Sequence, residues 1–286
     1  MTITALIEGG GTETRVRCLN NADQSLIAEV VTGPSNLGLG ADVCWQQIRD
    51  AVDLAGLSMP AKCVAGMAGS EYRQQRAEFL AQSPCQTLLV SDRDAGLFGA
   101  HYGKPGGCLT VGTGVAFAWI DHQGNLGRRG GFGFVLGDQG GGAWLGWRVL
   151  QELVCLSDSN QLDRFHHRLI AALGIGETAN HWMHFANGAG PRDFAELARA
   201  VVDSEHDVPL AAEILTEGLH WLCRLIEDFP RSLPLSLVGG LSTLYAPRLV
   251  ALGYQVVDPE GDALDGLRFI DQHLNHLIVD HWTSDA

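Results

Sequence analysis

The stretch that decides the fold is a glycine-threonine turn between two apolar runs, and the chain contains it twice. Residues 7–16 read IEGGGTETRV, and residues 109–117 read LTVGTGVAF. The two turns are 101 residues apart, counted from Gly11 to Gly112, and an alternating strand pattern follows each of them. The repeat predicts an internally duplicated protein with two related lobes and a cleft between them.

The chemistry of these turns favours phosphate binding. Glycine lets the backbone approach a ligand closely, and successive N–H groups form a concavity that suits phosphate oxygens. Thr12 and Thr113 add hydroxyl donors. Ordinary hairpin turns are the alternative interpretation, since they also favour glycine. Because the turn recurs with similar flanks, we expect the two turns to bind a nucleotide polyphosphate from both sides.

Length and composition indicate a globular protein of two domains. The chain has 286 residues, of which 46% are hydrophobic and 18% charged, and this length suits two domains of ordinary size. We predict an N-terminal lobe over residues 1–105 and a C-terminal lobe over 106–286. The formal net charge of −14 disfavours nucleic acid or an anionic membrane surface as a partner. An acidic protein that binds a nucleotide needs Mg²⁺ to bridge the charges.

Cysteine usage and hydropathy indicate a cytoplasmic protein. The seven cysteines include no C-x-x-C pair, and they stand inside apolar runs, as reduced thiols packed as small hydrophobes do. The first residues lack the basic and long apolar regions of a signal segment. No apolar run approaches the ~20 residues that span a bilayer. We therefore expect no membrane partner.

The pattern along the chain predicts an α/β protein. Strands are expected at 2–7, 14–19, 26–31, 62–67, 87–90, 115–120 and 235–238, and helices at 41–55, 71–82, 94–101, 143–156, 163–173, 193–204, 210–228 and 266–277. After the first hairpin, strands alternate with helices. This alternation is typical of a largely parallel inner sheet.

Asp92 is the candidate catalytic residue. It follows the strand expected at 87–90, and open α/β sheets place their ligands at the carboxyl ends of strands. A carboxylate there can accept the proton of a substrate hydroxyl during phosphoryl transfer. The competing interpretation is that Asp92 caps the next helix, since Asp is a favoured N-cap. Asp94 is the second candidate for either role.

Two further polar positions and two histidine pairs stand out. Asp138 lies in the glycine-rich run 137–142 before a helix, where it could bind sugar hydroxyls, help to hold a metal, or simply belong to a helix-start loop. Asn36 can both donate and accept a hydrogen bond, which suits a sugar hydroxyl or an amide. The pairs at 166–167 and 181–184 lack a convincing third metal ligand, so a solvated helix face is the better interpretation.

Taken in order, these segments resemble the BadF/BadG/BcrA/BcrD-type ATPase family, and within it the N-acetylglucosamine and glucosamine kinase branch. The matching stretches are 8–14, 33–36, 66–69, 91–100, 112–114, 131–140, 238–240 and 259–266. The resemblance implies a two-lobed, actin-like α/β fold, which is a duplicated ribonuclease-H-like unit with the nucleotide cleft between its lobes. It also implies ATP and Mg²⁺ as cofactors, an amino sugar as substrate, and a homodimer.

The resemblance also implies roles for individual residues. Asp92 would be the general base for the sugar C6 hydroxyl, and Glu8 would contact Mg²⁺ through water. Thr113 would help to orient the phosphoryl group. The expected sugar-binding residues are Ser35, Asn36, Asp92, Thr113 and Asp138. The expected nucleotide-binding residues are Gly9, Gly10, Gly11, Thr12, Thr14, Gly112, Thr113, Gly114, Gly239 and Gly240.

Four positions depart from the family pattern. Glu8 stands where Asp is usual, Glu13 where Lys is common, Val115 where Ser is common, and Gln139 where Glu is common. The expected activity is ATP-dependent phosphorylation of N-acetylglucosamine at C6. The alternatives are a glucosamine kinase, an ATPase that activates a dehydratase through an iron–sulfur cluster, a sugar-responsive regulator, and a nucleotide-dependent binding protein without catalysis. The sequence does not choose between N-acetylglucosamine and glucosamine.

Overall fold

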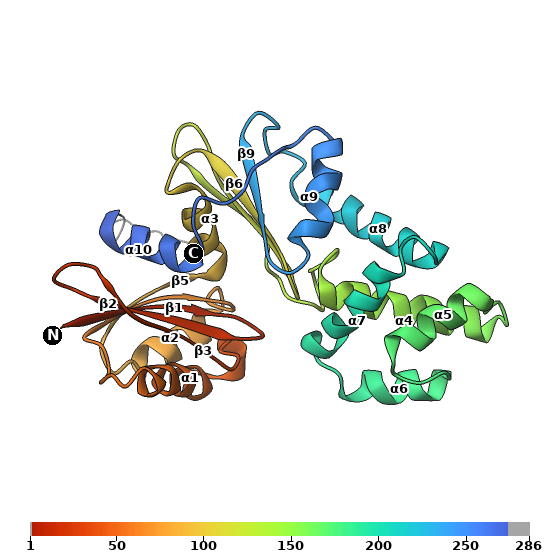
Figure 1. Cartoon of the computed structure of the whole chain (residues 1–286), viewed down its shortest axis with the longest axis horizontal. Helices are drawn as coiled ribbons and strands as arrows, with labels where there is room; N and C mark the ends of the chain where they lie inside the picture. The colour runs from red at the N-terminus through yellow and green to blue at the C-terminus, as the bar shows by residue number, and fades with distance from the viewer. Residues whose placement is uncertain (1, 274–286) are drawn as a thin grey trace. The chain divides into compact units, whose positions relative to one another are not determined.

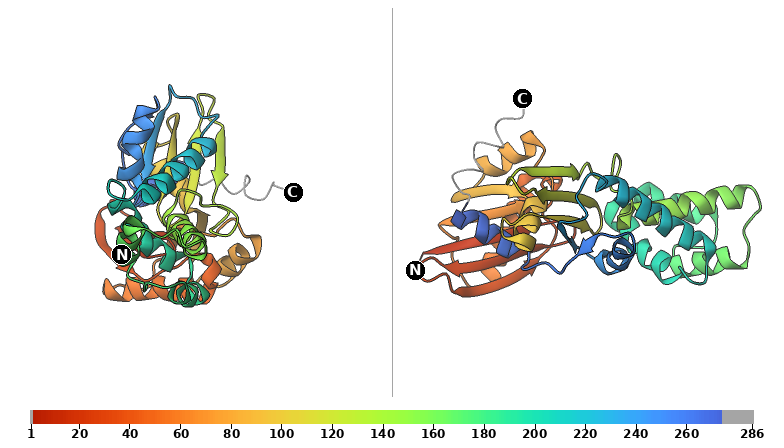
Figure 2. Two further views of the ribbon diagram at one scale, coloured as in Figure 1. Left: turned by 90° about the vertical axis from the view of Figure 1, so that its right-hand side faces the viewer. Right: turned by 90° about the horizontal axis from the view of Figure 1, so that it is seen from above.

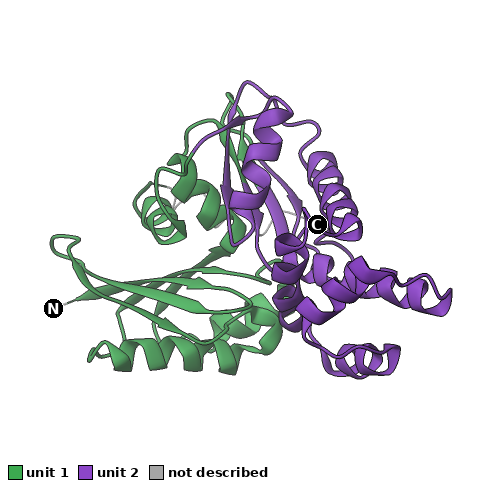
Figure 3. Cartoon of the chain, turned by 45° about the vertical axis from the view of Figure 1, so that its right-hand side comes forward, with its two compact units in different colours: residues 1–108, 118–126, 258–286 green, residues 109–117, 127–257 purple. Residues whose placement is uncertain are grey.

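The computed structural model describes residues 2–273, and these residues form two compact units. Unit 1 comprises residues 2–108, 118–126 and 258–273, and unit 2 comprises 109–117 and 127–257 (Figure 3). The last four residues of the helix expected at 266–277 lie outside the described residues. In the described part, no helix is both long and apolar enough to cross a bilayer.

The first sheet is mixed and has the order β3-β2-β1-β4-β5. Its strands are β1 (Ile3–Gly9), β2 (Thr14–Asn20), β3 (Leu26–Thr32), β4 (Lys62–Met67) and β5 (Gln86–Ser91). The hairpin strands β1, β2 and β3 are antiparallel, whereas β1, β4 and β5 run parallel. The expected parallel arrangement is therefore confirmed for the inner strands alone. The parallel strands bring the ends of β1, β4 and β5 to one edge of the sheet.

Helices cover both faces of the first sheet (Figure 1). They are the 3₁₀ turn η1 (Leu37–Leu39), α1 (Ala41–Leu54), α2 (Arg73–Ala81), α3 (Asp92–His101) and α10 (Ala263–His273). Helices α1 and α2 lie on one face, where the Trp45 and Phe79 rings stack with centroids 4.5 Å apart. Helices α3 and α10 lie on the other face. Because both faces are covered, nearly every residue of the central strand β1 is buried.

The second sheet repeats the topology of the first. Its order is β10-β9-β6-β7-β8. The strands β6, β7 and β8 are neighbours in chain order, as β1, β2 and β3 are in the first sheet. The strands β9 and β10 lie on the other side of β6, as β4 and β5 lie on the other side of β1. These strands are β6 (Gly106–Val111), β7 (Val115–Ile120), β8 (Leu126–Gly130), β9 (Pro234–Val238) and β10 (Gln255–Val256). The duplication that the two glycine-threonine turns predict is confirmed, because each turn joins the first two strands of its sheet.

Unit 2 also contains a cluster of helices with its own core (Figure 2). The helices of this unit are α4 (Gly142–Asp158), α5 (Arg164–Leu173), α6 (Ala179–Gly188), α7 (Pro191–Asp203), α8 (Pro209–Leu225) and α9 (Ser242–Ala251). Helices α4 and α7 pack closely at Gly146. A Cβ at this position would lie 1.9 Å from the carbonyl oxygen of Phe194, so the close approach requires glycine. Helix α6 and its histidines belong to this cluster, and no group of three metal-binding side chains occurs in the described residues.

The two units differ from the predicted lobes 1–105 and 106–286. The chain returns to unit 1 at 118–126 and again from residue 258. The chain returns to unit 1 at residue 258 because α10 packs against α3. A Cβ at Gly266 would lie 1.9 Å from the carbonyl oxygen of Ala95, and a Cβ at Gly99 would lie 2.0 Å from that of Asp262. Glycines thus allow the two helices to approach closely, and α10 completes unit 1.

Candidate active site

Asp92 is the first residue of α3, at the carboxyl end of β5. Ser91, which precedes it, is the N-cap, because its hydroxyl accepts a hydrogen bond of 3.1 Å from the backbone nitrogen of Asp94. The carboxylate of Asp92 accepts a bond of 2.9 Å from the backbone nitrogen of Arg93 and is half-buried. The cap is therefore supplied by Ser91. Asp94, the second candidate, is almost fully buried at 3% exposure.

The surroundings of Asp92 change the pKa of its carboxyl. Burial raises the pKa of its carboxyl to about 7, and the negative charges of Glu71 and Glu8 act in the same direction. The backbone N–H and the charge of Arg93 oppose this shift. Arg93 in turn pairs with Glu71 at 3.0 Å. A carboxylate with a pKa near neutrality is well suited to act as a general base.

The first glycine turn contains glycines in two different environments. A Cβ at Gly9 would lie 2.5 Å from the side chains of Met67 and Ser35, so this glycine is needed for packing. A Cβ at Gly10 would make only an ordinary contact, and one at Gly11 would meet no atom within 4 Å. Thr12 is exposed. Gly10, Gly11 and Thr12 are thus the part of the loop that a ligand can approach.

Three loops join next to this turn through backbone hydrogen bonds. The nitrogen of Ser35 donates to the carbonyl of Gly10 at 3.1 Å, and that of Ala68 donates to Gly9 at 2.8 Å. The nitrogen of Leu37 donates to Ala68 at 2.9 Å. The first glycine turn, the loop after β3 and the loop after β4 therefore form one rigid assembly at the edge of the first sheet.

Thr14 and Ser35 lie inside this assembly. Both are fully buried, and Thr14 Oγ1 lies 2.6 Å from both Ser35 Oγ and the carbonyl oxygen of Gly33. Their hydroxyls are thus bound to protein atoms, and the structure gives both residues a role in shaping the loops. Asn36 is half-buried, and its Oδ1 accepts a bond of 2.8 Å from the nitrogen of Gly38. Its amide nitrogen has no partner among the described residues, so Asn36 presents a donor.

Glu8, the candidate Mg²⁺ contact, is held by an arginine. Arg15 Nη1 lies 3.0 Å from Glu8 Oε2, and Arg15 Nη2 lies 2.6 Å from Asp262 Oδ2. Burial raises the pKa of Glu8, and Arg15 opposes this shift. No three acidic, histidine or cysteine side chains converge in the described residues. A Mg²⁺ that keeps several of its waters requires only one or two protein carboxylates.

The second turn is built around Asp138. A Cβ at Gly114 would lie 2.6 Å from Asp138 Oδ2, and the carboxylate of Asp138 accepts a bond of 2.9 Å from the nitrogen of Val115. Asp138 has a φ of 65°, a left-handed conformation that Asp tolerates better than most residues. Burial raises the pKa of its carboxyl, and the bond from Val115 opposes the shift. Asp138 therefore supports the turn.

Gly112 and Thr113 lie at the tip of this turn, on the start of α4. Their carbonyl oxygens accept bonds of 2.8 Å from the nitrogen of Gly142 and 3.0 Å from that of Ala143. A Cβ at Gly112 would meet no atom within 4 Å. The tip is thus fixed by the first backbone nitrogens of α4, while Gly112 remains open to a ligand.

The glycines after β9 show the same division. Gly239 has a φ of 97°, and a Cβ there would lie 2.6 Å from the carbonyl oxygen of Val111. A Cβ at Gly240 would meet no atom within 4 Å, and both glycines are exposed. Gly239 therefore lets β9 pass close to β6, and Gly240 is the position that a ligand can reach.

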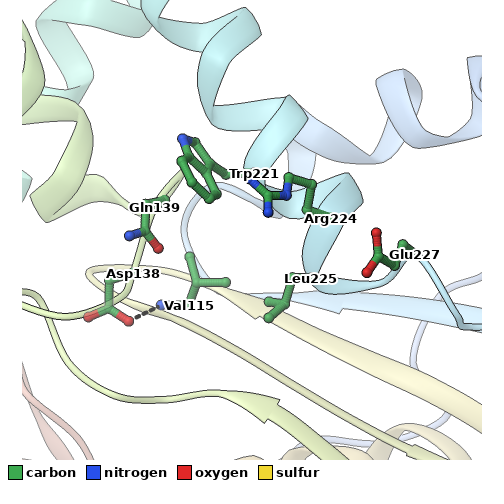
Figure 4. A pocket seen from close by; sticks show the side chains of 7 residues that line it. All are labelled: Val115, Asp138, Gln139, Trp221, Arg224, Leu225 and Glu227. Atoms are coloured by element: carbon green, nitrogen blue, oxygen red, sulfur yellow. Dashed lines mark hydrogen bonds between the residues drawn. The ribbon is translucent and has the colours of Figure 1, made fainter.

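A pocket of about 240 Å³ lies within unit 2, beside Asp138 (Figure 4). It is lined by Val115, Asp138, Gln139, Trp221, Arg224, Leu225 and Glu227. The Arg224 guanidinium lies 4.8 Å from the centre of the Trp221 ring. Its volume suits a single ring rather than a whole nucleotide. Two of the four departures from the family pattern, Val115 and Gln139, line this pocket.

The structure thus brings the expected residues together in two groups. In unit 1 the loops of Gly9–Thr14, Ser35–Asn36 and Glu8 are joined, and Asp92 is coupled to Glu8 through their charges. In unit 2 Asp138 contacts the Gly112–Gly114 turn. Sequence reasoning missed Arg15, Glu71 and Arg93 around the acidic groups, because ion-pair partners have no local motif. It also missed Trp221 and Arg224, whose i, i+3 spacing places them on one helix face.

Comparison with known proteins identifies relatives. No family model matches the chain. It is 27% identical over 231 residues to a glucosamine kinase, GspK, of Vibrio cholerae, covering 74% of each chain. It is 26% identical over 158 residues to an N-acetylmuramic acid/N-acetylglucosamine kinase of Clostridium acetobutylicum, covering 51% of each chain.

A solved structure resembles the chain over nearly its whole length. It is that of a protein from Chromobacterium violaceum, proposed to be an N-acetylglucosamine kinase. It matches with a TM-score of 0.84 and 30% identity, and the match covers 94% of this chain and 99% of that one. The expected family and the actin-like fold are both confirmed. The chain therefore belongs to the family of N-acetylglucosamine and glucosamine kinases within the actin-like sugar kinases.

Proposed function

We propose that this sugar kinase transfers the γ-phosphoryl group of ATP to the C6 hydroxyl of N-acetylglucosamine, with Asp92 as the general base. The observation that carries the proposal is Asp92 itself. It lies at the carboxyl end of β5, is not used as the helix cap, and has a pKa of about 7. In the reaction its carboxylate accepts the proton of the C6 hydroxyl. The C6 oxygen then bonds to the γ-phosphorus as the bond to the β-phosphate oxygen breaks, and ADP leaves.

The glycine turns supply the phosphate contacts in this proposal. Among the expected nucleotide-binding glycines, Gly11, Gly112 and Gly240 are positions at which an added Cβ would meet no protein atom within 4 Å, so a ligand can approach their backbone. Thr12 and Thr113 add hydroxyl donors beside two of them. A bound Mg²⁺ would neutralise phosphate charge, and Glu8 would hold its waters. Each turn by itself thus offers backbone and hydroxyl donors to a phosphate group.

Asn36 supports an acetylated amino sugar. Its amide oxygen is bonded to Gly38, so the group it presents is an N–H donor. A donor suits a carbonyl or hydroxyl oxygen, whereas a free ammonium needs an acceptor. Glucosamine is the second candidate, because the 27% identical relative is a glucosamine kinase.

The test is ADP release from Mg²⁺·ATP with a panel of acceptors. The panel contains N-acetylglucosamine, glucosamine, N-acetylmannosamine, N-acetylmuramic acid, glucose and water alone. We expect strong stimulation by N-acetylglucosamine, and analysis of the product should place the phosphate on C6. Stimulation by glucosamine alone would assign the second candidate. ATP turnover that no sugar stimulates would overturn the proposal.

A further inference from the structure

Glu8 and Arg15 face each other in the first hairpin. They are register partners in the antiparallel pair β1–β2, and Arg15 Nη1 lies 3.0 Å from Glu8 Oε2. The other terminal nitrogen of Arg15 lies 2.6 Å from Asp262 Oδ2 and 3.1 Å from Glu29 Oε1. One guanidinium thus joins the end of β1 to β3 and to the start of α10.

Asp262 is a fixed attachment point for this guanidinium. Its Oδ1 accepts a bond of 2.9 Å from the nitrogen of Asp265, and Asp265 Oδ2 accepts one of 3.0 Å from the nitrogen of Asp262. This reciprocal pair caps α10. The planar fork of arginine keeps its donors in a fixed geometry. A carboxylate bonded to Arg15 is therefore bonded to a group that is itself immobilised by a helix cap.

The pair contributes more to position than to stability. The side chains of Arg15 and Glu8 are 26% and 31% exposed, and ion pairs that water reaches contribute little to the free energy of unfolding. Their arrangement matters because glutamate has one more rotatable bond than aspartate. Without a partner, that additional bond leaves the carboxylate mobile, and Arg15 removes this freedom at Oε2.

We infer that Arg15 is a positioning residue that fixes the Glu8 carboxylate for the hydrated Mg²⁺ of the nucleotide. This inference rests on the proposed function, which assigns Glu8 to that cation. Arg15 bonds to Oε2 and so restricts the glutamate side chain at position 8. Arg15 itself touches neither nucleotide nor sugar.

Arg17 is a matched control for Arg15. It bonds to the same two neighbours, Glu29 at 2.8 Å and Asp262 at 3.0 Å, and also to Asp265 at 2.7 Å. It makes no bond to Glu8 among the described residues. Arg15→Met and Arg17→Met therefore remove similar ion pairs, and the contact with Glu8 distinguishes them.

The experiment measures ADP affinity by calorimetry with and without Mg²⁺, for the wild-type chain, Arg15→Met, Arg15→Lys and Arg17→Met. We expect Arg15→Met to weaken the Mg²⁺-dependent affinity about tenfold and Arg17→Met to change it less than twofold. Arg15→Lys, which retains one donor, should restore part of the loss. Glu8→Asp should remove most of the effect of Arg15→Met, because its carboxylate no longer reaches Arg15. Urea unfolding of each variant confirms that it folds.

Equal losses in Arg15→Met and Arg17→Met would overturn the inference, because a purely structural network would produce them. A wild-type chain whose ADP affinity does not depend on Mg²⁺ would also overturn it. Failure of the proposed function looks different, since it is a wild-type chain with no sugar-stimulated ADP release. The calorimetric comparison does not depend on that turnover.

Discussion

Ser91 Oγ lies 3.1 Å from the backbone nitrogen of Asp94 and accepts its hydrogen bond, so a serine caps α3 directly before Asp92. The helix cap and the proposed general base are thus adjacent residues that can be varied separately. We expect Asp92→Asn to lower kcat by roughly 10²–10⁴ and to leave the fold intact. Ser91→Ala should lower the free energy of unfolding by ~1 kcal/mol. ADP release and urea unfolding measure the two effects, and an unchanged kcat in Asp92→Asn would move the base to another residue.

The pH dependence of the rate follows from the pKa of about 7 at Asp92. Only the ionised carboxylate accepts a proton, so kcat/KM should fall about tenfold per pH unit below pH 7. It should level off above pH 8. The measurement is kcat/KM between pH 5 and 9 with saturating Mg²⁺·ATP. A rate that stays constant down to pH 5 would contradict the assignment.

The same pKa predicts an effect on stability. The folded-state pKa lies above the ordinary value of 3.8, so the folded chain binds this proton more tightly than the unfolded chain. Stability is therefore lost as pH rises from about 4 to 7. The loss is about 1–2 kcal/mol, less than the full shift implies, because water reaches part of the side chain.

Asp92→Asn removes this loss. The variant should unfold at a higher urea concentration than the wild type at pH 8, and the difference should be smaller at pH 4.5. Urea midpoints at the two pH values test the prediction. Asp158→Asn, a substitution in α4 of a residue distant in sequence from the acidic groups around Asp92, provides the control. A variant that is no more stable at pH 8 would show that burial does not raise the pKa of Asp92.

Gly9 and Gly11 should respond oppositely to substitution by alanine. At Gly9 the added Cβ would lie 2.5 Å from Met67 and Ser35, so Gly9→Ala should destabilise the fold by about 1–3 kcal/mol. At Gly11 it would meet no protein atom, and Gly11→Ala should retain wild-type stability within about 0.5 kcal/mol. If phosphates approach this backbone, Gly11→Ala should nevertheless weaken ADP binding. Unfolding and calorimetry together separate the two roles.

Cys85 should be the most reactive cysteine near neutral pH. Its sulfur lies 3.4 Å from that of Cys63, and the hydrogen bond between the two thiols lowers the pKa of Cys85 to about 6 against the opposing effect of burial. At pH 7 iodoacetamide should label Cys85 before the exposed Cys155. Cys63→Ala should slow the labelling of Cys85 and leave that of Cys155 unchanged. Peptide mass spectrometry reads both rates, and faster labelling of Cys155 would refute the prediction.

Local patterns made much of the fold predictable. The strands around the two glycine turns alternate in hydrophobicity, and glycine marks the turns themselves, so the duplication could be inferred from residues close together in sequence. Helix α9 was not predicted, because Pro247 lies inside it and proline normally interrupts a helix. Strands β8 and β10 were also missed, since their residues are few and only partly buried or exposed.

Contacts between distant parts of the sequence were not predictable. Arg15 and Asp262 are 247 residues apart, and no periodicity links them. The burial of Ser35 and Thr14 depends on how three loops meet, so their motif positions did not reveal that their hydroxyls bond to each other. The nucleotide and sugar contacts remain predictions, and the structure narrows them to residues whose polar groups or backbone are open to a ligand.

The close packing of Gly99 and Gly266 has a consequence for synthesis of the chain. Unit 1 contains both the first strands and α10, so the ribosome must release residues 258–273 before this unit can be completed. Residues 127–257 emerge earlier, and their helical core can form while the N-terminal sheet still exposes the face that α10 will cover. The part of unit 1 that is synthesised first therefore stays incomplete until α10 has been made.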